Sequence, residues 1–232
     1  MQKLKFSSWM SVVMVALVCL VAGCGGGSSG GSNEQIIDPI IPTVLFSDNF
    51  ESYSTGAWTP TNGWTPNINR GTWTIANDGS KALQYVAAAG GSDFIYRGQP
   101  TWTDITISAR VKMSAGSSYI SIARFKNGTN YHQLVLSPGA PGSMHLYIAH
   151  NGGTSTVGSQ PATANLDQFY NLKVVFSGQN IKGYLDDVLI VDYTDTLMDS
   201  HNNSGYAAIT TDDNRTTALR HGTFDEIIVT QP

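Results

Sequence analysis

The chain has 232 residues, with 13 lysines and arginines against 17 aspartates and glutamates and a formal charge of −4. An acidic chain without a basic stripe lacks the electrostatic footprint of a nucleic-acid-binding protein, so we exclude that class of partner. The two cysteines, Cys19 and Cys24, both precede the region that we expect to fold, so that region must be stabilised without a disulfide.

The first 23 residues have the organisation of a signal peptide. Lys3 and Lys5 precede an unbroken apolar run from Val12 to Ala22. This run has 11 residues, whereas a helix needs about 20 to span a bilayer. We therefore predict a cleaved signal peptide over residues 1–23 in preference to a transmembrane anchor.

The residues around Cys24 resemble a known processing signal. Val21-Ala22-Gly23-Cys24 is similar to the lipobox of bacterial lipoprotein precursors, which implies cleavage before Cys24 and attachment of lipid to its thiol. Acyl chains contribute about 0.8 kcal/mol per buried CH₂, so such an anchor holds firmly to a membrane. In Gram-negative lipoproteins a glycine such as Gly25 after the cysteine, in place of aspartate, is associated with export to the outer membrane. The resemblance thus implies a domain at the outer membrane or cell surface; ordinary secretion with a free cysteine is the alternative.

A tether follows the cysteine. Gly25 to Ser32 reads GGGSSGGS, a composition typical of a flexible coil, and Ile36 to Pro42 is an apolar stretch interrupted by prolines. We assign residues 24–43 to this tether and residues 44–232 to a single folded domain, which we expect to be monomeric.

The folded region is predicted to be all-β. Ile105, Ile107, Ala109, Val111 and Met113 alternate with polar residues, which indicates a strand with one buried face. Similar segments span Tyr119–Phe125, Tyr131–Leu136, Met144–Ala149, Leu172–Phe176, Ile181–Leu185, Val188–Val191, Tyr206–Thr210 and Phe224–Thr230. Turn residues separate them at Asn127-Gly128, Pro138-Gly139, Pro141-Gly142, Asn151-Gly152 and Asp186-Asp187. Many short strands at this spacing predict an antiparallel β-sandwich.

Four motifs in this region resemble a family. They are Phe46–Glu51, Ala123–Phe125 with Asn130–His132, Phe169–Val174 and Phe224–Val229. Their order is similar to that in the laminin-G-like domains of the concanavalin A-like superfamily, which implies an antiparallel two-sheet jelly-roll sandwich. Members of this superfamily include carbohydrate-binding modules, glycoside hydrolases and polysaccharide lyases, so the fold alone does not choose between binding and catalysis.

The motifs of known enzymes with this fold are missing. A Glu-x-Asp-x-x-Glu run, which would carry the paired carboxylates of a retaining glycosidase, does not occur. Neither a Gln-Ile-His strand nor a Tyr-Phe-Lys-Ala-Gly run, both typical of jelly-roll alginate lyases, is present. A lyase could still use a tyrosine or histidine as base and an arginine to neutralise a uronate, for which the candidates are Tyr131, His132, His145 and Arg124.

Strand alternation predicts a polar and aromatic cluster on one sheet face. If Leu134 and Leu136 point inward, Tyr131, Gln133 and Val135 share the opposite face, and the same rule places His145 and Tyr147 there. Arg124 joins them if Ala123 and Phe125 point inward, although Ile120 and Ile122 lie on the side of Arg124. The predicted glycan-binding residues are Arg124, Tyr131, Gln133, His145 and Tyr147. A solvated sheet face with ordinary cross-strand pairs is the alternative.

Calcium is the one cofactor that we consider, and no organic cofactor is expected. Related sandwiches often fix their first and last strands with a calcium ion, and the resemblance implies Asp225 as a ligand with Asp48 or Glu51 nearby. The alternative is that Asp225 caps the last strand by hydrogen bonding. The five histidines show no H-x-H or H-E-x-x-H spacing, which argues against a transition-metal site.

We therefore predict a membrane-anchored lipoprotein that binds polysaccharide or another glycan through a sheet face, because sugar binding requires only rings and polar groups at one surface. Two alternatives stay open: a polysaccharide lyase or glycosidase on the same fold, and a protein-binding adhesion or structural module.

Overall fold

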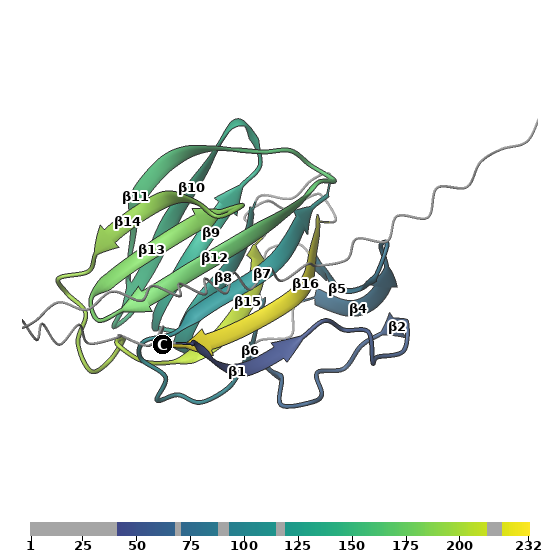
Figure 1. Ribbon diagram of the computed structural model, residues 1–232, viewed down its shortest axis with the longest axis horizontal. Coiled ribbons are helices and arrows are strands. Elements are labelled where there is room, and N and C mark those ends of the chain that lie inside the picture. The colour runs from purple at the N-terminus through teal and green to yellow at the C-terminus, as the bar shows by residue number, and fades with distance from the viewer. Residues whose placement is uncertain (1–40, 68–70, 88–92, 115–118, 213–219) are drawn as a thin grey trace, which may run out of the picture. The chain divides into compact units, whose positions relative to one another are not determined.

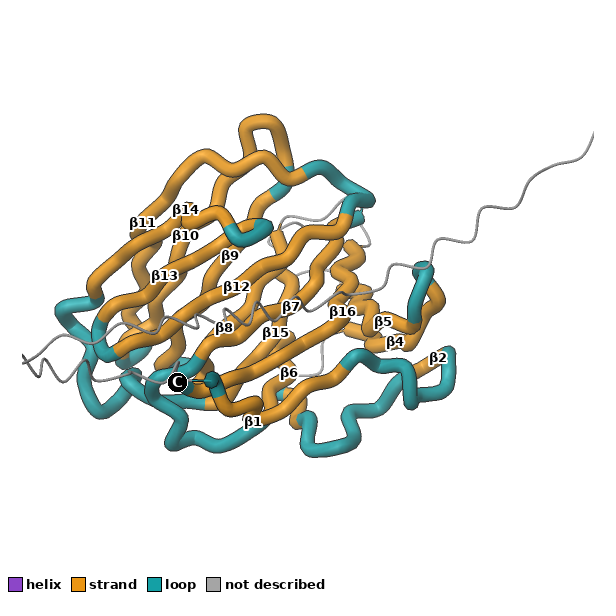
Figure 2. Tube along the Cα trace, in the orientation of Figure 1, coloured by secondary structure: helices purple, strands orange, loops and turns teal. Residues whose placement is uncertain are grey.

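The computed structural model describes residues 41–67, 71–87, 93–114, 119–212 and 220–232. In these ranges the chain consists of strands joined by turns and loops, without a helix (Figure 2). The described ranges therefore contain no helix of the length and apolarity that a bilayer crossing requires. The predicted signal peptide, Cys24 and nearly all of the predicted tether lie outside the described residues.

The strands form two antiparallel sheets, which appear as two layers in Figure 1. The nine-stranded sheet has the order β14 (Val188–Thr194), β13 (Asn180–Leu185), β12 (Phe169–Ser177), β7 (Thr106–Met113), β16 (Arg220–Gln231), β5 (Lys81–Ala87), β4 (Gly71–Asn77) and β2 (Gly56–Ala57), with β1 (Thr43–Asp48) also paired to β16. The seven-stranded sheet has the order β11 (Gly153–Ala164), β10 (Gly139–His150), β9 (Asn130–Ser137), β8 (Tyr119–Asn127), β15 (Tyr206–Asp212), β6 (Asp93–Arg97) and β3 (Thr65–Pro66). This architecture confirms the predicted all-β jelly-roll sandwich.

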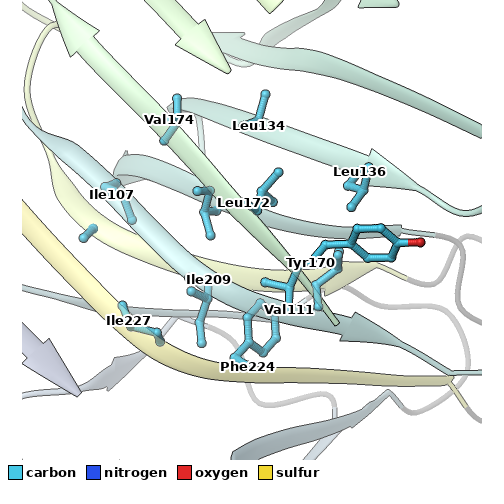
Figure 3. Packing of buried hydrophobic residues seen from close by; sticks show 14 of the residues in the cluster. Ile107, Val111, Leu134, Leu136, Tyr170, Leu172, Val174, Ile209, Phe224 and Ile227 are labelled. Carbon is cyan, nitrogen blue, oxygen red and sulfur yellow. The ribbon is translucent and has the colours of Figure 1, made fainter. Parts of the chain in front are cut away.

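Residue alternation places the core between the sheets. Along β7 every second residue is buried, as the sequence pattern predicts. Figure 3 shows Leu172 and Val174 of the nine-stranded sheet in the same cluster as Leu134 and Leu136 of the seven-stranded sheet. All the strand segments predicted from the sequence lie in strands of the structure, except that Ile105 directly precedes β7.

The turns follow local sequence chemistry. Asp186 and Asp187 have φ angles of 47° and 64° and form a two-residue turn between β13 and β14, as predicted. Asn151 and Gly152 also have positive φ, at 51° and 84°, in the turn between β10 and β11. Pro138-Gly139 and Pro141-Gly142 lie in the connection between β9 and β10, as predicted, because the pairing of these two strands begins at Ser137 and Ser143; Gly139 and Gly142 also pair with β11.

Candidate functional site

One face of the seven-stranded sheet carries most of the predicted binding residues. This outer face points away from the nine-stranded sheet. On β8, Ile120 and Ile122 belong to the core, so Ser121, Ala123 and Phe125 point outward. Cross-strand pairs extend the outer face to Phe94 and Tyr96 of β6; Tyr131, Gln133 and Val135 of β9; His145 and Tyr147 of β10; and Tyr206, Ala208 and Thr210 of β15.

The centre of the outer face is an aromatic floor. Phe94 and Phe125 are buried, and their ring centroids lie 5.0 Å apart at an interplanar angle of 23°. Ala123 and Ala208 belong to the same cluster, and their small side chains leave room on the sheet for these rings. The floor is separate from the main core, because the sheet itself lies between them.

Four half-buried tyrosines surround this floor and form a tyrosine rim. Tyr131 and Tyr147 are stacked, with centroids 6.1 Å apart, and Tyr96 and Tyr206 are 4.7 Å apart. A tyrosine ring offers an apolar face and a polar hydroxyl, which is the combination that a sugar ring can contact.

Polar side chains complete the outer face. Gln133 is buried and donates from Nε2 to Ser121 Oγ at 2.7 Å, so this pair is a satisfied polar group within the aromatic surroundings. His145 is half-buried, and burial lowers the pKa of its imidazole, which favours the neutral ring near pH 7. The structure thus brings Tyr131, Gln133, His145 and Tyr147 to one face, as the alternation predicts.

The prediction for Arg124 is wrong: its side chain lies between the two sheets and not on the outer face. It is 1% exposed, and its guanidinium carbon lies 4.3 Å from the centroid of the Phe176 ring in the opposite sheet. The reason is strand parity. Arg124 follows Ile120 and Ile122 on the inner side of β8, while Ala123 and Phe125 point outward.

Arg124 is the centre of a buried polar network. Its guanidinium donates to the backbone carbonyls of Thr103 at 2.9 Å and Asn202 at 3.0 Å. The nitrogen that donates to Asn202, Nη2, also lies 3.4 Å from Nδ1 of His132, whose Nε2 lies 2.8 Å from Oδ2 of Asp195. These partners assign the tautomer: Nε2 donates to the carboxylate, and Nδ1 accepts from the guanidinium.

The protonation states in this network follow from burial and hydrogen bonding. Burial lowers the pKa of Arg124 to about 10, so the guanidinium stays charged at neutral pH. Burial also lowers the pKa of His132, more than the Asp195 carboxylate raises it, so the imidazole is neutral. The hydrogen bond from His132 is the main reason that the pKa of Asp195 is lowered. A neutral imidazole therefore bridges a cation and an anion inside the sandwich.

The lyase residues predicted from the sequence are divided by the sheet. Tyr131 and His145 lie on the outer face, whereas His132 and Arg124 are 0% and 1% exposed on the inner side. A substrate on the outer face would not reach the inner pair, so these four residues do not form one catalytic set. Strands β8, β9 and β10 also contain no aspartate or glutamate that could act as a glycosidase carboxylate.

The three predicted calcium ligands are already engaged by protein donors. Asp48 Oδ2 accepts from Tyr53 and from Trp64, each at 2.9 Å. Asp225 Oδ2 accepts from Ser80 at 2.8 Å and Arg110 at 3.2 Å.

The third ligand, Glu51, is engaged by Lys81. Its carboxylate accepts from the Lys81 backbone N–H, and the Lys81 ammonium donates to the carbonyls of Glu51 and Tyr53. The side-chain oxygens of Glu51, Asp48 and Asp225 do not gather into a common group. The arrangement therefore offers no open set of carboxylate oxygens, and calcium binding stays a prediction.

A separate pocket of about 700 Å³ opens beside Asp48. Its lining includes Tyr53, Asn62, Arg97 and Glu226, of which Arg97 lies 3.6 Å from the Asp48 carboxylate. This pocket is a concave surface with polar groups, and its lining residues are not those of the outer face of the seven-stranded sheet.

Sequence reasoning missed part of the aromatic surface. Phe94 and Tyr96 lie on β6, a strand of five residues that was not predicted, while Tyr206 and Ala208 lie on a predicted strand. The available signal was the run of three strand-favouring residues Phe94-Ile95-Tyr96, but it is short.

Comparisons with known proteins show the fold. No family model and no curated protein matches the chain. The carbohydrate-binding module CBM66 from Bacillus subtilis is 19% identical, with a TM-score of 0.57 over 73% of this chain and 96% of that one. The alginate lyase Aly36B is 13% identical (TM-score 0.56, 82% and 97% covered), and a Bacillus subtilis protein of unknown function with a galectin-like fold is 12% identical (TM-score 0.56, 82% and 96% covered). At these identities, the similarity establishes the sandwich fold.

Proposed function

We propose that this chain binds polysaccharide or another glycan through the outer face of its seven-stranded sheet. The observation that carries the proposal is the aromatic floor of Phe94 and Phe125 surrounded by the tyrosine rim. Sugar-binding surfaces need aromatic faces for the C–H side of a pyranose and hydrogen-bonding groups for its hydroxyls. A carbohydrate-binding module and an alginate lyase among the structural neighbours support a glycan as the ligand class.

Affinity electrophoresis of the full-length chain in gels containing a panel of polysaccharides tests the proposal. Tyr147→Ala should reduce retardation by the best ligand, because it removes one ring of the stacked pair with Tyr131. Loss of about 1 kcal/mol of stacking corresponds to an affinity about fivefold lower. Tyr147→Phe should retain most of the binding, since it keeps the ring.

A matched control comes from the opposite side of the molecule. Tyr184 on β13 is also half-buried, but it belongs to the nine-stranded sheet, where the Lys173 ammonium lies 4.7 Å from its ring centroid. Tyr184→Ala should bind like the unmodified chain. Equal retardation of Tyr147→Ala and the unmodified chain would contradict the proposed surface, and a loss in Asn49→Ala would place binding at the pocket beside Asp48.

The same panel of polysaccharides, incubated with the chain in solution and run in the gels, tests the two alternative functions. Unsaturated products that absorb in the ultraviolet would show a lyase activity. Retardation by none of the polysaccharides would favour recognition of a protein.

We also propose that lipid on Cys24 anchors this domain to a bacterial membrane, on the basis of the lipobox-like residues that precede it. Fractionation of cells expressing the full chain tests the anchor. The unmodified chain should sediment with membranes, while Cys24→Ser should not.

A further inference from the structure

A cluster of metal-ligating side chains lies away from the outer face. His150 Nε2 is 3.3 Å from one carboxylate oxygen of Asp199, and His201 Nδ1 is 3.0 Å from the other. In the part of the chain that the structure describes, this is the one group of three such residues whose ligand atoms all lie within 4.8 Å of one another. Neither its residues nor their chemistry enters the proposed glycan site.

The fold brings these residues together from two distant segments. His150 is the last residue of β10, directly before the turn to β11, and its nitrogen also lies 3.2 Å from the Asn151 amide. Asp199 and His201 belong to the loop between β14 and β15. Because the segments are about fifty residues apart in sequence, no local spacing signals the cluster.

Hydrogen bonds already shape the loop that holds two of the three ligands. Asn202 Oδ1 accepts from the Asp199 backbone N–H at 2.9 Å, and the Asp199 carbonyl accepts from Asn203 at 2.8 Å. The buried Arg124 donates to the carbonyl of Asn202 at 3.0 Å. The loop is therefore held to the sandwich, and little ordering remains for a ligand to impose.

The ligand types and their spacing suit a first-row divalent metal. Two imidazoles and one carboxylate are a common three-ligand set for zinc, with bonds of about 2.0–2.2 Å. Two ligands on a tetrahedral ion with such bonds are separated by about 3.3 Å. The separations of 3.3 Å and 3.0 Å, each to a different oxygen of the Asp199 carboxylate, lie near this value, and the ligand atoms of all three residues lie within 4.8 Å of one another.

The cluster is also accessible. The side chains of His150, Asp199 and His201 are 27%, 45% and 59% exposed. An ion could therefore enter from solvent, and its remaining coordination position would face water.

We propose that His150, Asp199 and His201 form a binding site for a divalent transition metal, with zinc as the best match. The bound ion joins the β10–β11 turn to the loop between β14 and β15. It acts as a clamp at this end of the sandwich, and the proposal does not depend on glycan binding.

Isothermal titration of the metal-free full-length chain with Zn²⁺ tests the site. Asp199→Asn and His201→Ala should each lower the affinity at least tenfold, because each removes one of three ligands. His145→Ala is the control, since His145 is a histidine on the outer face, outside the cluster. If His201→Ala bound Zn²⁺ with the same affinity as the unmodified chain, the proposal would be overturned, and the cysteines would be the next candidate ligands. A chain that binds no Zn²⁺ would also overturn it, leaving a hydrogen-bonded cluster without a metal.

The clamp is tested by thermal unfolding with and without Zn²⁺. One equivalent should raise the melting temperature of the unmodified chain and of His145→Ala, but not that of Asp199→Asn. The melting temperatures without metal show whether each variant is folded. An equal shift in Asp199→Asn and the unmodified chain would contradict the clamp.

Discussion

Replacement of Arg124 by methionine should remove a large part of the stability of the sandwich. The guanidinium donates to two backbone carbonyls at 2.9 and 3.0 Å, and it packs on the ring of Phe176. A hydrogen bond from a charged donor contributes about 1.5–3 kcal/mol, so two of them contribute about 3–6 kcal/mol. Methionine keeps part of the apolar contact but leaves both carbonyls without their donor. We expect a loss of about 3–5 kcal/mol, as is typical when one partner of a buried ionic network is removed.

Urea unfolding of the full-length chain, followed by tryptophan fluorescence, measures this loss. A domain of this kind is stable by about 5–15 kcal/mol, so the midpoint should fall clearly. Lys173→Met is the control, because its ion pair with Asp187 is exposed and should contribute at most about 1 kcal/mol. If Arg124→Met loses no more than Lys173→Met, the buried network does not stabilise the fold as we argue.

Two further predictions concern the interior. The folded-state pKa of His132 lies below its unfolded value of about 6.5, so the unfolded chain binds the additional proton. The contribution of His132 to the free energy of unfolding should be fully present above about pH 6.5 and should decrease as the pH falls below it. His145 contributes in the same direction, and so does Asp195 below about pH 4. A urea midpoint that does not change between pH 7.5 and 5 would contradict this prediction. Gly183→Ala would place a Cβ atom 2.5 Å from a methyl group of Leu134 in the opposite sheet. It should lower the free energy of unfolding, measured in urea, by about 1–3 kcal/mol. Gly128→Ala is the control, because there is open space around Gly128, and it should change the free energy of unfolding little.

Many of the half-buried strands could be predicted from the sequence, because burial on one face forces a period of two, although β4 has the same pattern and was not predicted. β7 and β12 show this pattern in both sequence and structure. β11 was not predicted, because it is a mostly exposed strand at the edge of its sheet and pairs only with β10. Its polar sequence shows no alternation of apolar and polar residues. The strand is held by hydrogen bonds to β10, and strand propensity within the segment does not indicate such a partner.

The binding residues were predicted only where parity was unambiguous. Tyr131, Gln133 and Tyr147 follow from leucines that clearly point inward. Arg124 was misplaced because a charge is expected outside, whereas here backbone carbonyls from two distant segments compensate its burial. These hydrogen bonds to distant carbonyls arise from the tertiary structure, and the residue pattern of β8 does not indicate them.

The same two strands serve both stability and the proposed binding, with the roles separated by side-chain direction. β8 and β9 carry Arg124 and His132 toward the interior, and Phe125 and Tyr131 toward the outer face. A change in the inner pair removes support from the loop between β14 and β15, because Arg124 holds its Asn202 carbonyl. A change at Tyr147 removes only half-buried contacts from the outer face. Loss of glycan binding with an unchanged urea midpoint therefore identifies a contact residue, whereas loss of both identifies a residue that supports the sandwich itself.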